Sequence, residues 1–137
     1  MTISLVVDTS ALVAIVKDEP GAREMLAVLM RATTGLPAPA LVEFQRVMAR
    51  VGNRPDPRAF ALVEALELQV MAFGVAAAEA ATTANEKFGS GNGRGGPLNL
   101  LDLMVYAAAK VENLPLLCTG KDFAATDARL HPASRPY

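Results

Sequence analysis

Short apolar runs alternate with helix-type segments along this chain, and this alternation limits the possible folds more than any other feature. Residues 3–8 form a β-branched run ended by polar residues, as expected of a buried strand. Similar runs occupy residues 70–73 and 116–119, while residues 36–39 are either a short strand or a crossing into the next helix. The alternation predicts a three-layer α/β/α fold with a short, mostly parallel sheet of four to five strands flanked by helices.

The segments between these runs have helical spacing of their apolar residues. Leu41, Phe44 and Met48 form one such apolar stripe, and Glu43 lies on a neighbouring face of the same helix. No repeat or second domain is visible, so residues 1–137 are expected to form one domain. The predicted helices cover residues 11–16, 22–32, 41–51, 57–66, 75–88 and 99–112, with a helical turn at 122–124 and a weak last strand near 129–131.

The charge and the rare residue types exclude several classes of protein. The net charge of −1 lacks the basic excess of a sequence-reading DNA binder, although it does not exclude an enzyme that approaches phosphate through a metal ion. Cys118 and His131 are the only cysteine and histidine, so neither an internal disulfide nor a cysteine–histidine zinc site is possible. No apolar run is long enough to span a bilayer, and a cytoplasmic location is the natural expectation.

Four acidic residues occupy positions that converge in a parallel sheet. Asp8 directly follows the first predicted strand, and Asp122 comes just after the strand at residues 116–119. Glu43 and Asp102 lie near the starts of their helices, which begin at the edge of the sheet where strands end. Because sites in open parallel sheets form beyond the carboxyl ends of the strands, these acids are predicted to share one rim.

A cluster of carboxylates without histidine or cysteine suits hard divalent cations. Packed carboxylates repel one another unless a cation neutralises them. Mg²⁺ and Mn²⁺ prefer such oxygen ligands, and they can polarise a phosphodiester and activate water. The predicted rim therefore fits metal-assisted phosphodiester chemistry better than acyl transfer.

Each acid also has a purely structural interpretation. Asp8 and Asp122 are placed to cap the helical turns that follow them, and Asn99 with Asp102 is spaced like a helix-capping pair. Glu43 can pair with an arginine on a solvated helix face. Only the joint placement of the four acids favours a site.

Four motifs occur in order between residues 6 and 127. They are VDTSALVAI with DEP in residues 7–20, PALVE in residues 39–43, FG with LNLLD and YAAAK in residues 88–110, and PLLCTGKDF with TD in residues 115–127. The ordered set resembles the PIN-domain ribonucleases, in particular the VapC toxins of type II toxin–antitoxin pairs.

This resemblance implies a PIN-like fold and a metal-dependent endoribonuclease that hydrolyses RNA. Asp8 and Asp102 would be the main ligands of Mg²⁺ or Mn²⁺, and Glu43 and Asp122 would complete the catalytic cluster. The resemblance also implies a homodimer and a cognate VapB-like antitoxin that covers the site. Thr9, Ser10 and Thr119 are candidates to orient the ligands as supporting residues, although helix or turn capping is at least as good an interpretation of Ser10.

The chain departs from the family pattern in two places. Members often carry two acids before the phenylalanine of the last motif, whereas this chain has Lys121 and Asp122, and the role falls to Asp122 because it directly precedes Phe123. Leu101 replaces a small residue before Asp102. Lys121 either touches the scissile phosphate or lies in solvent.

Other basic residues have two open interpretations. Arg94, in the glycine-rich loop of residues 89–97, is a candidate phosphate contact from a lip over the substrate. Arg46 and Arg50, with the arginines that follow them, either line an RNA groove beside Glu43 or form a solvated helix face. Asp127 is expected to make a local turn bond rather than to join the cluster.

Competing functions remain at this level. The string GNGRGG in residues 91–96 matches a dinucleotide-binding fingerprint, but it follows a helix instead of the first strand. An aspartyl-phosphate enzyme acting through Asp8 would usually carry a second aspartate where this chain has Ser10. A catalytically silent PIN-like module that only binds a partner is the non-enzymatic alternative.

Overall fold

The computed structural model describes residues 2–93 and 97–136, which are arranged around one parallel sheet. Its four strands lie in the order β3-β2-β1-β4. Val6 at the centre pairs with Gly35 on one side and with Leu116 on the other. The strands are β1 (Leu5–Val7), β2 (Thr34–Pro37), β3 (Gln69–Met71) and β4 (Leu116–Leu117).

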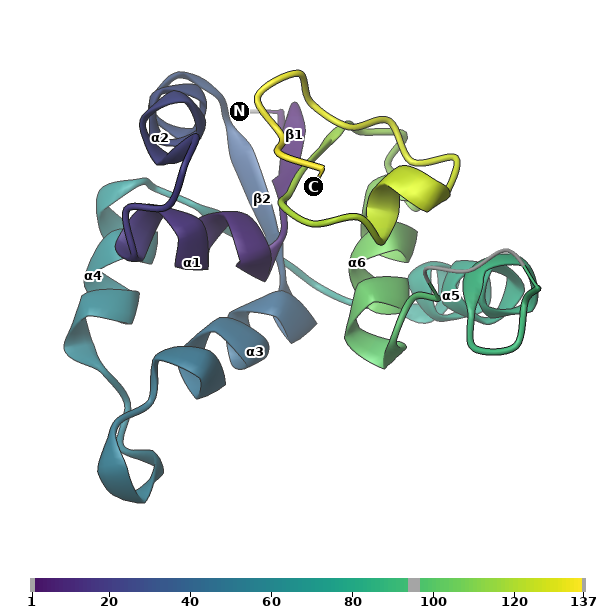
Figure 1. The fold of residues 1–137 in the computed structure, drawn as a ribbon, viewed down its shortest axis with the longest axis horizontal. Coiled ribbons are helices and arrows are strands. Elements are labelled where there is room, and N and C mark those ends of the chain that lie inside the picture. The colour runs from purple at the N-terminus through teal and green to yellow at the C-terminus, as the bar shows by residue number, and fades with distance from the viewer. Residues whose placement is uncertain (1, 94–96, 137) are drawn as a thin grey trace.

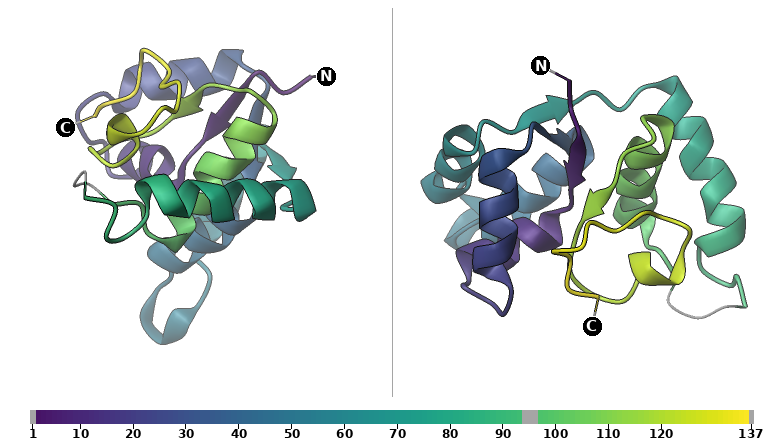
Figure 2. Two further views of the ribbon diagram at one scale, coloured as in Figure 1. Left: turned by 90° about the vertical axis from the view of Figure 1, so that its right-hand side faces the viewer. Right: turned by 90° about the horizontal axis from the view of Figure 1, so that it is seen from above.

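Helices cover both faces of this sheet, which confirms the predicted three-layer α/β/α class (Figure 1). The first four helices lie to one side of the strands, and the last two lie to the other in both Figure 1 and Figure 2. No helix within the described ranges is long and apolar enough to cross a membrane. The helices are α1 (Thr9–Val16), α2 (Ala22–Arg31), α3 (Ala38–Met48), α4 (Pro57–Ala65), α5 (Val75–Phe88) and α6 (Leu100–Val111), with 3₁₀ turns η1 (Val51–Asn53) and η2 (Phe123–Ala125).

The core lies between the central strands and the helices that follow them. Every residue of β1 is buried, as its continuous apolar sequence requires in a sheet covered on both faces. Leu12 of α1 and Phe44 of α3 are completely buried against it. This packing fixes the ends of β1, α1 and α3, and therefore the backbone around Asp8 and Glu43.

The weak segment at residues 36–39 combines both of its predicted interpretations. β2 starts at Thr34 and ends at Pro37, and the chain enters α3 directly at Ala38. A Cβ at Gly35 would lie 2.5 Å from the Met71 Sδ of β3, so a larger residue there would have to displace the Met71 side chain. α3 ends at Met48, because Ala49 is extended, and Val51 belongs to η1 instead of the helix.

The outer strands are shorter than the sequence predicts. β4 stops at Leu117 because its partner strand β1 ends there: Asp8 turns the chain into α1. The last hydrogen bond between the two strands runs from the Asp8 N–H to the Leu117 carbonyl at 2.9 Å. The last strand predicted near residues 129–131 is reduced to one isolated parallel bridge between Leu130 and Leu116, and a second bridge joins Arg135 to Thr119. Between these bridges, the Ser134 hydroxyl accepts from the Cys118 N–H at 3.2 Å in place of a backbone partner.

Candidate active site

Asp8 is fixed at the junction of β1, β4 and α1. It is the N-cap of α1, and its Oδ2 accepts a hydrogen bond from the Ser10 N–H at 3.0 Å. The side chain is 5% exposed. Burial raises the pKa of this carboxyl, the bonds from Ser10 act in the opposite direction, and the nearby negative charge of Glu43 raises the pKa further. Asp8 is thus a buried acid that forms no ion pair with a lysine or arginine within the described chain.

Asp102 lies in the first turn of α6 and forms a reciprocal cap with Asn99. The Asp102 N–H donates to Asn99 Oδ1 at 2.8 Å, and the Asn99 N–H donates to Asp102 Oδ2 at 3.2 Å. Partial burial raises the pKa of Asp102 to about 6, and the charges of Asp8, Asp122 and Glu43 add to this rise. All three other candidate acids therefore act on Asp102, as expected if they share the carboxyl edge of the sheet.

Glu43 and Asp122 complete this group in different ways. Glu43 lies on the second turn of α3 and is partly buried, and in the described part of the chain it forms no ion pair with Arg46 or Arg50. Asp122 directly precedes η2 and is exposed, and its side chain makes no capping bond. Neither of the structural roles suggested by the sequence is therefore realised for these two acids, whereas both capping roles are realised for Asp8 and Asp102.

The two hydroxyl residues after Asp8 connect the segments that carry the acids. Thr9 Oγ1 donates to the Ala40 carbonyl at 3.0 Å in the buried interior, which ties the start of α1 to the start of α3. Ser10 Oγ accepts from the Thr119 N–H at 3.0 Å, which ties α1 to the end of β4. These bonds position the backbone of the site, and Ser10 in addition hydrogen-bonds the Asp8 carboxylate.

The donor chemistry of the cluster fits a hard divalent cation. Hydrogen bonds from the Ser10 and Asn99 N–H groups hold the carboxylates of Asp8 and Asp102 in place, and carboxylate oxygens are the ligands that Mg²⁺ and Mn²⁺ prefer. As the side chains stand, no three acidic, histidine or cysteine residues among positions 2–93 and 97–136 form a ready metal cage. A bound cation would draw the carboxylates together, and it would relieve the charge repulsion that adds to burial in raising the pKa of Asp102.

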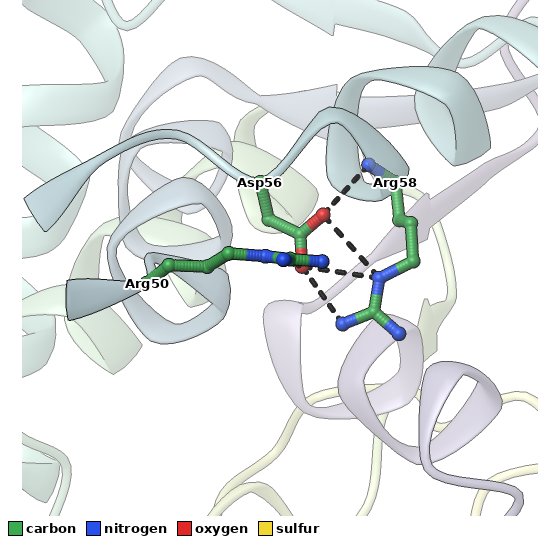
Figure 3. A network of polar contacts seen from close by, with 3 residues as sticks. All are labelled: Arg50, Asp56 and Arg58. Carbon is green, nitrogen blue, oxygen red and sulfur yellow. Dashed lines mark hydrogen bonds and ion pairs between the residues drawn. The ribbon is translucent and has the colours of Figure 1, made fainter.

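Sequence reasoning missed a second polar cluster, shown in Figure 3. Asp56 is 1% exposed, and its Oδ2 accepts from Nε and Nη2 of Arg58 at 3.1 and 2.8 Å. Nε of Arg50 lies 3.6 Å from the same oxygen. The hydrogen bonds from Arg58 lower the pKa of Asp56 to about 2. In the sequence, Asp56 before Pro57 indicates only a helix cap, which it also is, since Oδ1 accepts from the Arg58 N–H at 2.9 Å.

Two further expectations have clear outcomes. Asp127 was expected to make a local turn bond, but it accepts hydrogen bonds from Tyr106 and, at 3.1 Å, from Lys110, and so ties the tail to α6. Arg94 of the glycine-rich loop lies outside the described residues. Lys121 is exposed beside Asp122, and no ion pair holds it in the described part of the chain.

Comparison with known proteins agrees with this architecture. The PIN domain model matches residues 5–129. VapC ribonuclease Mb2780c of Mycobacterium bovis is 39% identical over 130 residues, which cover 91% of this chain and 97% of that protein. Ribonuclease VapC30 of Mycobacterium tuberculosis is 35% identical, with 90% and 95% covered.

Solved structures share the fold at low sequence identity. A toxin–antitoxin complex from Klebsiella pneumoniae superposes with a TM-score of 0.70 at 19% identity, covering 94% of this chain and 98% of that one. VapC20 of Mycobacterium tuberculosis, described as a Sarcin-Ricin loop cleaving toxin, gives a TM-score of 0.68 at 16% identity, with 91% and 96% covered. With a family model over most of its length and close relatives over nine tenths of it, this chain belongs to the PIN domain family and, within that family, to the VapC ribonucleases.

Proposed function

We propose that this chain is a divalent-metal-dependent endoribonuclease that hydrolyses phosphodiester bonds in RNA and acts as the toxin of a toxin–antitoxin pair. The observation that carries the proposal is the coupling of Asp8, Glu43 and Asp122 to Asp102 at one edge of the sheet. Relatives named as ribonucleases at 39% and 35% identity support RNA as the substrate.

The roles of the four acids follow from their surroundings. Asp8 and Asp102 are the principal ligands of Mg²⁺ or Mn²⁺, because hydrogen bonds at the starts of α1 and α6 hold both carboxylates in place. When bound, the ion supplies Lewis-acid polarisation of the phosphodiester and lowers the pKa of the attacking water. Glu43 and Asp122, which no ion pair or capping bond engages among the described residues, would complete the cluster and hydrogen-bond that water.

The remaining residues of the edge keep these acids in register. The Thr9 hydroxyl fixes the helix that carries Glu43, and the Ser10 hydroxyl fixes the strand end that precedes Asp122. Reacting groups held by such supports lose little freedom in the transition state. In this proposal the Thr9 and Ser10 hydroxyls hold the backbone of the site in position, and the four acids supply the negative charge that binds the metal ion.

A VapB-like antitoxin is the proposed protein partner, and a homodimer is the proposed form of the toxin. The antitoxin partner is supported by structural neighbours that include a toxin–antitoxin complex from Klebsiella pneumoniae and a DNA-bound VapBC from Salmonella typhimurium. In this proposal the antitoxin covers the carboxylate edge and the protein acts in the cytoplasm, where its RNA substrates lie. The aspartyl-phosphate alternative has no counterpart among the relatives named above.

The test is cleavage of total RNA by the purified protein with Mg²⁺, with Mn²⁺ and with EDTA, followed by mapping of the cut ends. Asp8→Asn and Asp102→Asn are expected to lower cleavage by at least about a hundredfold while the far-ultraviolet spectrum stays unchanged. Asp18→Asn is the matched control, since Asp18 is exposed and its φ of 52° suits asparagine. Full cleavage in EDTA, or by Asp102→Asn, would overturn the proposal.

A further inference from the structure

Four exposed arginines surround the connection between α3 and α4, and they are called the arginine surface below. Residues 44–63 contain these arginines and a single acid, Asp56, in a chain whose net charge is −1. This is a strong local excess of positive charge. The members of the arginine surface are Arg46, Arg50, Arg54 and Arg58.

Asp56, the one acid of this segment, holds two of the arginine side chains in place but leaves them exposed to solvent. Asp56 is buried, yet the side chains of Arg50 and Arg58, which it binds, remain 63% and 67% exposed (Figure 3). Because Asp56 fixes one edge of the Arg58 guanidinium, the rest of that group faces solvent in a set orientation. An anion that binds there needs to immobilise less of the side chain, which favours binding.

The backbone places the remaining arginines beside this pair. The Arg50 N–H donates to the Arg54 carbonyl at 2.9 Å, and the pair closes a small loop around η1. Figure 1 shows this loop projecting from the body of the molecule beyond the end of α3. Arg46 and Arg54 form no ion pair in the described part of the chain, so their charges are available.

The arginine surface begins next to the carboxylate edge. Glu43, which acts electrostatically on Asp8 and Asp102, lies three residues before Arg46 on α3. Residues three apart share a helix face, and the rise per residue puts Arg46 about 4.5 Å further along the axis. The face of α3 that carries Glu43 thus leads to Arg46, the first member of the arginine surface.

We propose that the arginine surface binds the phosphate backbone of the single-stranded RNA whose scissile bond enters the carboxylate site. This inference rests on the proposed function, which places RNA at the acids. A polyanion approaching four carboxylates in a chain of negative net charge meets repulsion, and binding requires positive charge nearby. Arginine forks suit phosphate oxygens through paired hydrogen bonds.

The experiment measures how salt weakens RNA binding in EDTA, where cleavage is not required. Fluorescence anisotropy of a short fluorescein-labelled single-stranded RNA gives Kd for the wild type and for Arg46→Gln/Arg54→Gln, which leaves the Asp56 pairs intact. Each lost contact lowers the slope of log Kd against log salt by about 0.7, so the double variant is expected to lose about 1.4. Between about 50 and 200 mM salt, the affinity of the double variant for RNA is therefore expected to fall by a factor roughly sevenfold smaller than that of the wild type.

Arg23→Gln/Arg31→Gln is the matched control. These exposed arginines belong to α2, which lies away from the η1 loop in Figure 1 and Figure 2. Replacing them removes the same charge as the double variant of the arginine surface does. The control is expected to keep the wild-type slope. If the double variant melts early, Arg54→Gln alone on the exposed loop is expected to lose about half as much slope.

The outcomes separate this inference from the proposed function. RNA cleavage by the wild type together with an unchanged slope in Arg46→Gln/Arg54→Gln would overturn the arginine surface while the ribonuclease proposal stands; a surface that recognises an acidic partner protein would give this result. An equal loss of slope in the control would overturn it as well. A selective loss of slope supports the surface even if the wild type cleaves nothing, and in that case the ribonuclease proposal alone fails.

Discussion

Replacing Asp102 by asparagine should stabilise the metal-free protein, although the same change should abolish its activity. The pKa of Asp102 is raised from 3.8 to about 6, mainly by burial and then by the charges of Asp8, Asp122 and Glu43. The folded state therefore binds this proton more tightly than the unfolded state does. Stability is then lost as the pH rises from about 4 through about 6, and the full cost is present at neutral pH.

The size of the effect follows from the pKa and the surroundings. A rise from 3.8 to about 6 corresponds to about 3 kcal/mol at about 1.36 kcal/mol per pKa unit. Because the side chain is partly exposed, solvent screening reduces this figure to about 1–2 kcal/mol. Asparagine lacks the negative charge that stabilises the start of α6, which costs the variant about 0.5 kcal/mol of this gain. Its side-chain oxygen can still accept a hydrogen bond from the Asn99 N–H. The net gain is about 1 kcal/mol, or about 4 °C in Tm.

Thermal melting of the wild type and Asp102→Asn in EDTA, followed by circular dichroism across the pH range, measures this difference. The two melting temperatures should converge near pH 4 and separate by about 4 °C above pH 6, because only the wild type has the titrating group. Added Mg²⁺ should raise the Tm of the wild type more than that of the variant. A variant that melts at or below the wild type at neutral pH in EDTA would refute the reasoning.

Three further predictions concern the supports of the site and the fold. Ser10→Ala removes the acceptor of the Thr119 N–H and should cost about 1–2 kcal/mol in urea unfolding, with a fall in kcat; unchanged stability and kcat would contradict the bridging role. Phe44→Ala should cost about 3–5 kcal/mol and exposed Phe60→Ala less than about 1 kcal/mol, and similar urea midpoints for both would argue against the described core. The pKa of Asp56 is lowered to about 2, so wild-type stability should fall as the pH drops from about 4 to about 2. Acid melting curves of Asp56→Asn should lack this fall, and a parallel decline in both proteins would rule it out.

The sequence was sufficient for the fold class because the central elements follow simple periodic patterns. The uninterrupted apolar run of β1 and the stripe through Phe44 specify what is buried without knowledge of their partners. The ends of the outer strands were less predictable, since they depend on neighbours. β4 ends where β1 turns at Asp8, and the tail beside it relies on the Ser134 hydroxyl, a contact that no local pattern indicates.

The candidate site shows the same division. The positions of Asp8 and Asp102 and their parts in helix caps followed from strand ends and helix starts, and the structure adds the electrostatic coupling among the acids. The bridges made by Thr9 and Ser10 cross 31 and 109 residues, so the sequence could suggest these side chains but not their partners. Asp56 was missed because a helix cap explains its position fully, and only packing reveals that it also organises two arginines.

The most direct test of the central claim is to locate a bound ion. Crystals grown with Mn²⁺ and measured for anomalous scattering should show a peak in contact with carboxylate oxygens of Asp8 and Asp102, with Glu43 and Asp122 turned toward it. The same crystals of Asp102→Asn should lose most of that peak. No peak at this edge at saturating Mn²⁺, or a peak that persists in the variant, would contradict the account.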